Sequence, residues 1–343
     1  MFHHHLLLLS RAALLLRHAT GLSHAAISLI EGNLGRLGLS LPRFRRQSQG
    51  ALVARGDEPT RDRKRRANSP LLIHYHIFKN AGTSFEWALA QVLGAKYRSL
   101  DTQHSHGFIS AGDLVDFSFR HPEVTAISSH QAAPPPPRIF GREIFTSILI
   151  RDPIARIRSI YAFERAQGTS NPGAVKAREL SFREYVEWRL ETSPIAICNF
   201  QVNFCSRTSS NFGPPPGPAQ LEQAIANLDS MSIVGTVVRF DEWLALAQNT
   251  LSTALPAFTL PAVRLNATSE GRPSESEIFE KLVEEVGEET AKHLLENNKL
   301  DMCLHQVADA LLTRRLAERG VKVTLLQAYK SELEGRPATL QVI

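Results

Sequence analysis

The sequence predicts an α/β fold, in which a mainly parallel sheet is flanked by helices on both faces. Two observations lead to this prediction. With 343 residues, of which 43% are hydrophobic, the chain can bury a large core. Short β-rich runs also alternate with segments of helical periodicity, an order typical of parallel sheets whose crossover helices cover both faces. The runs that we interpret as strands lie at 71–78, 124–129, 145–150 and 232–240.

The first strand and helix lie at 71–93, with the sequence LLIHYHIFKNAGTSFEWALAQVL. Apolar residues alternate in its first part and recur at helical spacing in its last part, on either side of a turn at 79–84. A strand, a glycine-containing turn and a helix present free backbone N–H groups and a positive dipole end to an anion. The turn therefore predicts a phosphate site, although the hydroxyls of Thr83 and Ser84 could instead only cap the helix.

A second strand and helix follow the same plan. The strand FTSILI at 145–150 precedes Asp152, a suitable N-cap, and Pro153, a suitable first helical residue. Arg151 is thereby placed at the carboxyl end of a strand, the edge at which open α/β sheets bind ligands. Ser159 is placed about two turns into the helix.

The remaining elements are predicted from capping boxes, breakers and apolar stripes. They are, in order, a strand at 124–129 ending at His130, an extended loop at Pro134–Pro137, helices starting at Ser181 and Ser274, a strand at 232–240, an amphipathic helix at about 241–255, and a closing helix with an apolar stripe over 300–312 that Gly320 ends.

The positive charge of the chain is concentrated in its first seventy residues. Residues 1–70 hold twelve Arg or Lys against four Asp or Glu, a net charge of +8, whereas the whole chain carries +5. We expect 1–70 to be a mostly disordered basic arm, 71–325 to be the folded domain and 326–343 to be a C-terminal tail. The bulk charge of the folded domain does not indicate a nucleic acid partner.

The apolar runs of the arm are interrupted by Arg11 and Arg17, so none approaches the ~20 residues of a spanning helix. No stable membrane span is therefore expected. The three cysteines are too few for a disulfide scaffold. A reducing, cytoplasmic location is the simpler expectation, with membrane association through the arm as the alternative.

Two motifs in this order carry a resemblance to a known family. IFKNAGTSFEWAL resembles the 5′-phosphosulfate loop of sulfotransferases that use 3′-phosphoadenosine 5′-phosphosulfate (PAPS), and ILIRDPIARIRSIYAF resembles their 3′-phosphate motif. The similarity is closest to carbohydrate sulfotransferases of the heparan sulfate 2-O and 6-O type and their bacterial relatives. It implies a P-loop-like fold, PAPS as donor co-substrate, no metal, and transfer of a sulfuryl group to a hydroxyl of an oligo- or polysaccharide.

The resemblance also implies roles for the donor-site residues. Lys79 would stabilise charge on the leaving 5′-phosphate oxygen, and Arg151 with Ser159 would hold the 3′-phosphate. Arg272 could fold over the nucleotide or could be an ordinary surface arginine. The 5′-phosphate would be held by the turn residues Lys79, Asn80, Ala81, Gly82, Thr83 and Ser84.

A general base is expected, because the acceptor hydroxyl must lose its proton as it attacks. His130 is the candidate, since it ends a predicted strand at the ligand edge and falls where the resembling enzymes carry histidine in a Gly-His pair. Here Ser129 replaces that glycine. His104 and His106 are the next candidates.

Acceptor contacts are expected at 199–203, where the family tends to carry Asn-x-Gln-x-Arg near the acceptor sugar. Asn199 and Gln201 match this pattern, but Asn203 occupies the arginine position. A carboxylate-bearing sugar is for that reason a weaker expectation.

Two other functions remain open. A nucleotide-dependent P-loop kinase shares the strand–turn–helix geometry, but the spacing G-x-x-x-x-G-K-[ST] is absent because Lys79 precedes the glycine. The other alternative is a non-catalytic polysaccharide-binding relative that has lost turnover. The presence of Lys79, Arg151 and Ser159 argues against it.

Overall fold

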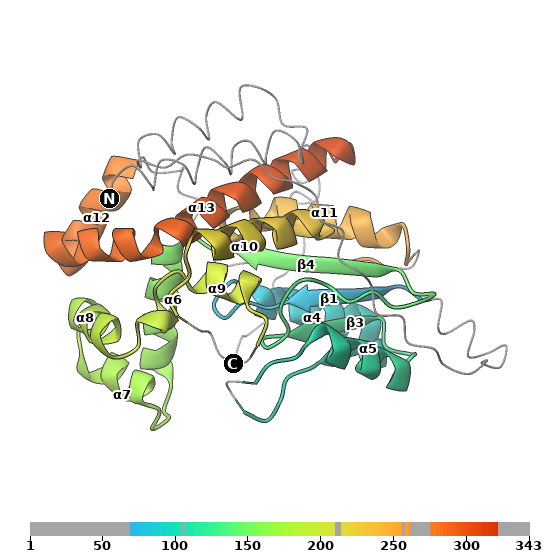
Figure 1. The fold of residues 1–343 in the computed structure, drawn as a ribbon, viewed down its shortest axis with the longest axis horizontal. Helices are drawn as coiled ribbons and strands as arrows, with labels where there is room; N and C mark the ends of the chain where they lie inside the picture. The colour runs from blue at the N-terminus through green and yellow to red at the C-terminus, as the bar shows by residue number, and fades with distance from the viewer. Residues whose placement is uncertain (1–68, 105–106, 210–213, 256–257, 261–274, 322–343) are drawn as a thin grey trace, which may run out of the picture.

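The computed structural model describes residues 69–104, 107–209, 214–255, 258–260 and 275–321, drawn in colour in Figure 1. Residues 1–68 of the basic arm and the whole C-terminal tail lie outside the described residues, as do His106 and Arg272. Among the described residues, no helix combines the length and apolar character needed to cross a bilayer.

A five-stranded sheet forms the centre of the described chain, and all its strand pairs are parallel. The predicted α/β class is thereby confirmed. The strand order is β2-β3-β1-β4-β5, with β1 between β3 and β4. The strands are β1 (Leu71–Tyr75), β2 (Tyr97–Ser99), β3 (Ala126–Ser129), β4 (Ile144–Ile150) and β5 (Ile233–Thr236).

Three strands, β1, β2 and β5, differ most from the sequence prediction. The strand predicted at 71–78 ends at Tyr75. β2 is only three residues long and was not predicted, because so short a run carries no readable alternation. The strand predicted at 232–240 stops at Thr236, and the 3₁₀ helix η3 (Val237–Arg239) follows it. Valine favours strands, but Val238 is 66% exposed and has no sheet neighbour to pack against.

The helices begin and end largely where their caps predict. Asp152 accepts a hydrogen bond from Ala155 N at 2.7 Å, Ser181 forms a capping box, and Gly320, with φ 62°, follows the closing helix. The capping box at Ser274 lies outside the described residues. The helices are α4 (Gly82–Leu93), η1 (Gly94–Lys96), α5 (Ala111–Arg120), α6 (Pro153–Ala166), α7 (Pro172–Glu179), α8 (Phe182–Thr192), η2 (Pro194–Ala196), α9 (Phe200–Ser206), α10 (Pro218–Ser230), α11 (Phe240–Ser252), α12 (Glu275–Val286) and α13 (Glu288–Glu318).

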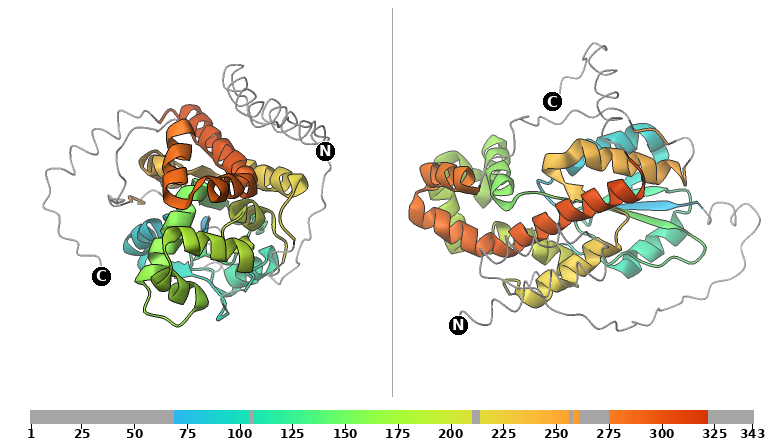
Figure 2. Two further views of the ribbon diagram at one scale, coloured as in Figure 1. Left: turned by 90° about the vertical axis from the view of Figure 1, so that its left-hand side faces the viewer. Right: turned by 90° about the horizontal axis from the view of Figure 1, so that it is seen from above.

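Both faces of the sheet are covered by helices. One apolar cluster packs α4 and α11 on the face formed by Leu72, Phe145 and Leu149. Another packs α5, α9, α10 and α13 on the face formed by Ile73 and Ile148. The view from above in Figure 2 shows α13 running diagonally across the sheet.

A third apolar cluster joins α6, α7 and α8 to α12 and the beginning of α13. In Figure 1 the arrowhead of β4 points towards this group of helices. These helices border the carboxyl edge of the sheet. The carboxyl ends of the strands therefore lie between the core of the sheet and the third apolar cluster.

Candidate functional site

The predicted site residues converge at the carboxyl edge of the sheet. β1 lies between β3 and β4, so the turn after β1 meets His130 on one side and Arg151 on the other. Arg151 Nη1 donates to the carbonyl oxygen of Lys79 at 2.9 Å. On the other side, His130 Nδ1 lies 2.8 Å from the carbonyl oxygen of His76. The chain crosses from β3 past β1 to reach β4, which makes this edge the topological switch point where such sheets bind ligands.

The turn that joins β1 to α4 is held in an uncommon conformation. Lys79 (φ 66°) and Ala81 (φ 62°) both have left-handed backbones, which non-glycine residues rarely adopt. The buried side chain of Asn80 fixes the turn, since its Nδ2 donates to Leu149 O at 2.8 Å and to Gln201 Oε1 at 2.7 Å. Strained turns of this kind are over-represented at functional sites.

The first turn of α4 has no side-chain cap, because its N-cap residue is Ala81. Its backbone N–H groups therefore remain available to an anion. Thr83 is exposed and Ser84 is half-buried at this end of the helix. The structure thus places the predicted hydroxyl donors beside the uncapped backbone.

Gly82 has a structural reason to be glycine that the sequence did not reveal. A Cβ atom at this position would lie 2.2 Å from Cδ2 and 2.4 Å from Nε2 of His76. The glycine therefore makes room for the His76 ring, in addition to any close approach of a phosphate.

Lys79 and Arg151 are neighbouring cations, and neither forms an ion pair with any carboxylate of the described chain. Burial, followed by the charge of Arg151, lowers the pKa of Lys79. Burial also lowers the pKa of Arg151, although Asp152 opposes the shift. Arg151 Nε is buried and has no hydrogen-bond partner within the described residues. Two adjacent cations that form no ion pair within this part of the chain indicate a site for an anion.

An aromatic residue on α6 holds the lysine side chain. Lys79 Nζ lies 4.2 Å from the centre of the Phe163 ring, a cation–π contact. Ser159 is half-buried on the same helix, four residues before Phe163. Residues four apart share one face of a helix, so the predicted 3′-phosphate contact lies on the side of α6 that faces Lys79.

His130 is exposed at the end of β3, and its protonation is constrained by its partner. A carbonyl oxygen only accepts, so the bond to His76 O requires the proton of a neutral His130 ring on Nδ1 and leaves the lone pair on Nε2. Partial burial and then repulsion from His76 lower the pKa of His130, while Asp101 opposes the shift. The ring is therefore suited to accept a proton near neutral pH.

The sequence analysis missed Glu86, which lies behind these histidines on α4. Its Oε1 lies 2.9 Å from His76 Nδ1 and accepts from Ser128 Oγ at 2.5 Å. Burial opposes ionisation of Glu86. The hydrogen bond from His76, the electrostatic attraction to His76 and the hydrogen bond from the Ser128 hydroxyl outweigh it and lower the pKa of Glu86 to about 2. Only the packing of α4 on β1 and β3 brings these groups together, so no spacing in the sequence signals them.

His76, Glu86 and His130 also offer three potential metal-ligand atoms within 4.8 Å of one another. The sequence predicted no metal site. The two imidazole rings lie 3.9 Å apart at an interplanar angle of 31°. Nδ1 of His76 and Nδ1 of His130 are both engaged in hydrogen bonds, to Glu86 and to the carbonyl oxygen of His76, so the observed contacts are those of a hydrogen-bonded network.

The residues expected to bind the acceptor are engaged inside the protein. Gln201 is fully buried, and its amide uses its full hydrogen-bonding capacity on Asn80, Arg151 and Asp301. Asn199 Oδ1 accepts from the backbone N–H of Leu300 and Asp301. Gln201 therefore serves the turn after β1 in this structure, and only Nδ2 of Asn199 remains for an acceptor.

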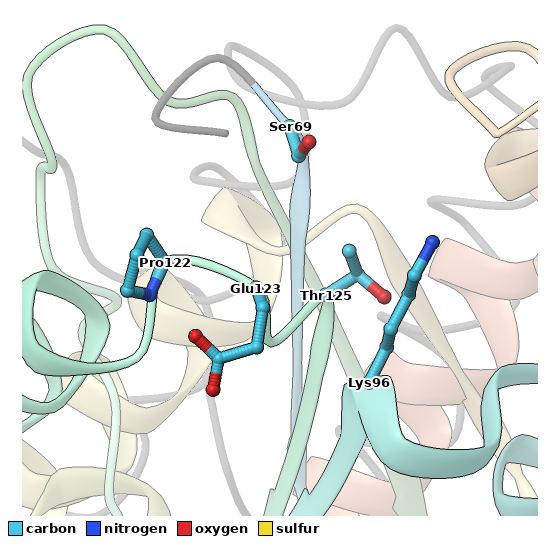
Figure 3. A pocket seen from close by; sticks show the side chains of 5 residues that line it. All are labelled: Ser69, Lys96, Pro122, Glu123 and Thr125. Carbon is cyan, nitrogen blue, oxygen red and sulfur yellow. The ribbon is translucent and has the colours of Figure 1, made fainter. Parts of the chain in front are cut away.

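His104 lies in the loop after β2, where its carbonyl oxygen accepts from Gln131 Nε2 at 2.7 Å. A cavity of about 330 Å³ lies elsewhere, and Figure 3 shows its lining. Its residues are Ser69, Lys96, Pro122, Glu123 and Thr125. These residues precede β1, β2 and β3, so the cavity lies at the amino edge of the sheet, opposite the predicted site.

The chain matches no family model. It is similar to an uncharacterized protein of Archaeoglobus fulgidus, with 28% identity over 248 residues. The alignment covers 69% of this chain and 95% of the archaeal protein. A likeness to an uncharacterized protein assigns no activity, so a functional proposal depends on the site itself.

Proposed function

We propose that the protein is a PAPS-dependent sulfotransferase that acts on a hydroxyl of an oligo- or polysaccharide. The observation that carries the proposal is the pair of cations, Lys79 and Arg151, which lie beside the uncapped start of α4 and form no ion pair with a carboxylate of the described residues. PAPS carries phosphate groups at both ends of its adenosine, and the two predicted anion contacts lie at the ends of adjacent strands, β1 and β4.

Each residue has a distinct task in this proposal. Lys79 would leave the Phe163 ring and stabilise the negative charge that grows on the leaving 5′-phosphate oxygen. The backbone of α4, Thr83 and Ser84 would hold the 5′ end. Arg151, whose Nε lacks a partner, would hold the 3′-phosphate with Ser159.

The transfer breaks the bond between sulfur and the 5′-phosphate oxygen as a bond between sulfur and the acceptor oxygen forms. The acceptor proton passes to Nε2 of His130, and the products are a sulfate ester and adenosine 3′,5′-bisphosphate. Most of the rate enhancement would come from positioning and electrostatic stabilisation, as in phosphoryl transfer.

A cytoplasmic location is part of the same proposal. Cys198, Cys205 and Cys303 are all free thiols, which suits a reducing compartment.

The test is transfer of radiolabelled sulfate from PAPS to a panel of glycans by the wild-type protein and two lysine variants. Lys79→Ala should lower kcat by about 10²–10³-fold, the usual loss when one donor to a developing oxyanion is removed. Lys96→Ala is the matched control, since Lys96 is exposed at the opposite edge of the sheet and should leave the rate unchanged.

Ligand binding separates the proposal from its alternatives. Adenosine 3′,5′-bisphosphate should bind more tightly than ATP. Tighter binding of ATP together with phosphate transfer would identify a kinase. Binding of a glycan without consumption of PAPS would identify a non-catalytic relative.

A further inference from the structure

His76 has no role in the proposed reaction, although it lies beside the proposed base His130. It follows the last residue of β1 and is only 4% exposed. Its ring lies between Glu86 of α4, at 2.9 Å from Nδ1, and the ring of His130, whose centre is 3.9 Å away. A buried imidazole that contacts both a carboxylate and the proposed base requires an explanation of its own.

The hydrogen bonds around His76 fix the positions of two protons. Glu86 is an ionised carboxylate, so it accepts and His76 Nδ1 donates. The backbone oxygen of His76 in turn accepts from Nδ1 of His130. The network therefore runs from Ser128 and Glu86 through the side chain and backbone of His76 to the ring of His130.

We infer that His76, held by Glu86, is a positioning residue for His130. The ring of His76 packs against the ring of His130, and the backbone oxygen of His76 accepts the hydrogen bond that places the His130 proton on Nδ1. Nε2 of His130 then stays unprotonated and free to take the acceptor proton. This inference rests on the proposed function for its purpose, but the geometry that it describes can be measured without turnover.

The other groups around His130 do not remove this effect. Asp101 Oδ1 accepts the backbone N–H of His130 at 2.9 Å, and Asp101 and Glu86 both favour a protonated ring. Among the neighbouring charges, His76 has the largest effect and lowers the pKa of His130. The charged and titratable groups around His130 are His74 from β1, His76 directly after β1, Glu86 from α4, Asp101 from the loop after β2, and Arg207 directly after α9.

Nuclear magnetic resonance of the full chain with ¹⁵N-labelled histidine tests the inference directly. His130 should show the Nδ1–H tautomer in the wild-type protein. His76→Phe keeps an aromatic ring but removes the imidazole whose repulsion lowers the pKa of His130, so the midpoint of the His130 titration should move to higher pH. His121→Phe is the matched control, because His121 lies near the amino edge of the sheet, 44% exposed, and should leave His130 unchanged.

Three results would overturn the inference. They are an Nε2–H tautomer of His130 in the wild-type protein, an unchanged His130 midpoint in a folded His76→Phe variant, and micromolar Zn²⁺ binding that shifts both histidines. The first and third need no variant, so they decide the matter even if His76→Phe fails to fold.

Kinetics then link the inference to the proposed reaction. The acidic limb of kcat/KM in His76→Phe should follow the His130 midpoint, with the affinity for adenosine 3′,5′-bisphosphate unchanged. A shifted midpoint in a protein that transfers no sulfate would refute the proposed function and leave the histidine arrangement standing. If the variant transfers sulfate but the acidic limb of kcat/KM does not move with the His130 midpoint, the positioning role would be refuted instead.

Discussion

The carboxyl edge of the sheet has two layers that differ in how completely their polar groups are satisfied. The outer layer, which we define as Lys79, Arg151 and His130, keeps unused hydrogen-bonding capacity. The inner layer, which we define as Arg156, Gln201 and Asp301, has its polar groups engaged by neighbouring protein atoms. A buried polar group without a hydrogen-bond partner costs free energy unless a ligand supplies one, so the outer layer is where chemistry is expected.

Two arginines from one motif illustrate the difference. Arg156 is 2% exposed, donates to the carbonyl oxygens of Phe78 and Ala196, and stacks on Phe200 with its guanidinium carbon 4.0 Å from the ring centre. Arg151, five residues earlier, leaves Nε without a partner. Both arginines donate to the backbone at the turn after β1, but only Arg151 keeps a donor that no described residue accepts from.

The largest effect is expected in the outer layer, at His130. His130→Ala should lower kcat for sulfate transfer by about 10²–10⁴-fold, the usual contribution of a positioned general base. The acidic limb of the pH profile should disappear with it. The melting temperature should stay near the wild-type value because the ring is exposed.

His104→Ala is the control, since His104 contacts the region only through its carbonyl oxygen. If the acidic limb survives in His130→Ala, the base must be a different group. A large loss of thermal stability would instead place His130 in the inner layer.

The sequence placed the residues of the outer layer at one edge of the sheet, but it did not reveal the contacts of the inner layer. Lys79, Arg151 and His130 each follow a strand of the central sheet, so strand prediction alone placed them at one edge. Gln201 and Asp301 meet only because α9 packs on α13, a contact between positions far apart in the chain. Local periodicity has no access to such a contact.

The same limit explains the other surprises. Glu86 was missed because its partners come from β1 and β3, and Gln201 was assigned to the acceptor because a motif gives residue types without their hydrogen bonds. The predicted fold class needed only the order of the elements, which the periodicity supplied.

A second test of the outer layer concerns the nucleotide. Arg151→Ala should weaken adenosine 3′,5′-bisphosphate much more than adenosine 5′-monophosphate in calorimetry, because a charge-assisted hydrogen bond contributes roughly 1.5–3 kcal/mol. Arg138→Ala, at an exposed position in the loop before β4, is the matched control. Equal losses for both nucleotides would remove Arg151 from the 3′-phosphate site.

The inner layer should respond in stability. Asp301 accepts the backbone N–H groups of Gln201 and Val202 at 3.0 and 2.8 Å. Asp301→Asn keeps the shape but places an NH₂ group against one of these donors, which should cost about 1–3 kcal/mol in the free energy of unfolding. Asp116→Asn, on the exposed side of α5, should cost almost nothing.

Denaturant unfolding measures both variants. Sulfate transfer by the folded fraction of Asp301→Asn should remain within a few-fold of wild type. A stable Asp301→Asn protein with lost turnover would mean that the two layers are not separate.

The smallest effect is expected from Glu86, which joins the layers, and it should depend on pH. The pKa of Glu86 is about 2 in the folded protein, below its ordinary value of 4.5. A depressed carboxyl pKa contributes stability above the ordinary value, and this stability is lost as pH falls towards the folded value. Glu86→Gln should therefore be less stable than wild type at pH 5 to 7, and the difference should shrink between pH 4.5 and 2.

Urea unfolding at several pH values within this window measures the difference. Buried His74, whose pKa is lowered to about 3, also titrates in this window, and the comparison of Glu86→Gln with the wild-type protein offsets its contribution because both proteins keep His74. Glu179→Gln provides the baseline, because Glu179 forms an exposed ion pair with Lys176 that contributes little to stability. A Glu86→Gln difference that stays constant from pH 7 to pH 2 would show that the carboxylate is not held by His76 and Ser128, and the link between the two layers would then lie elsewhere.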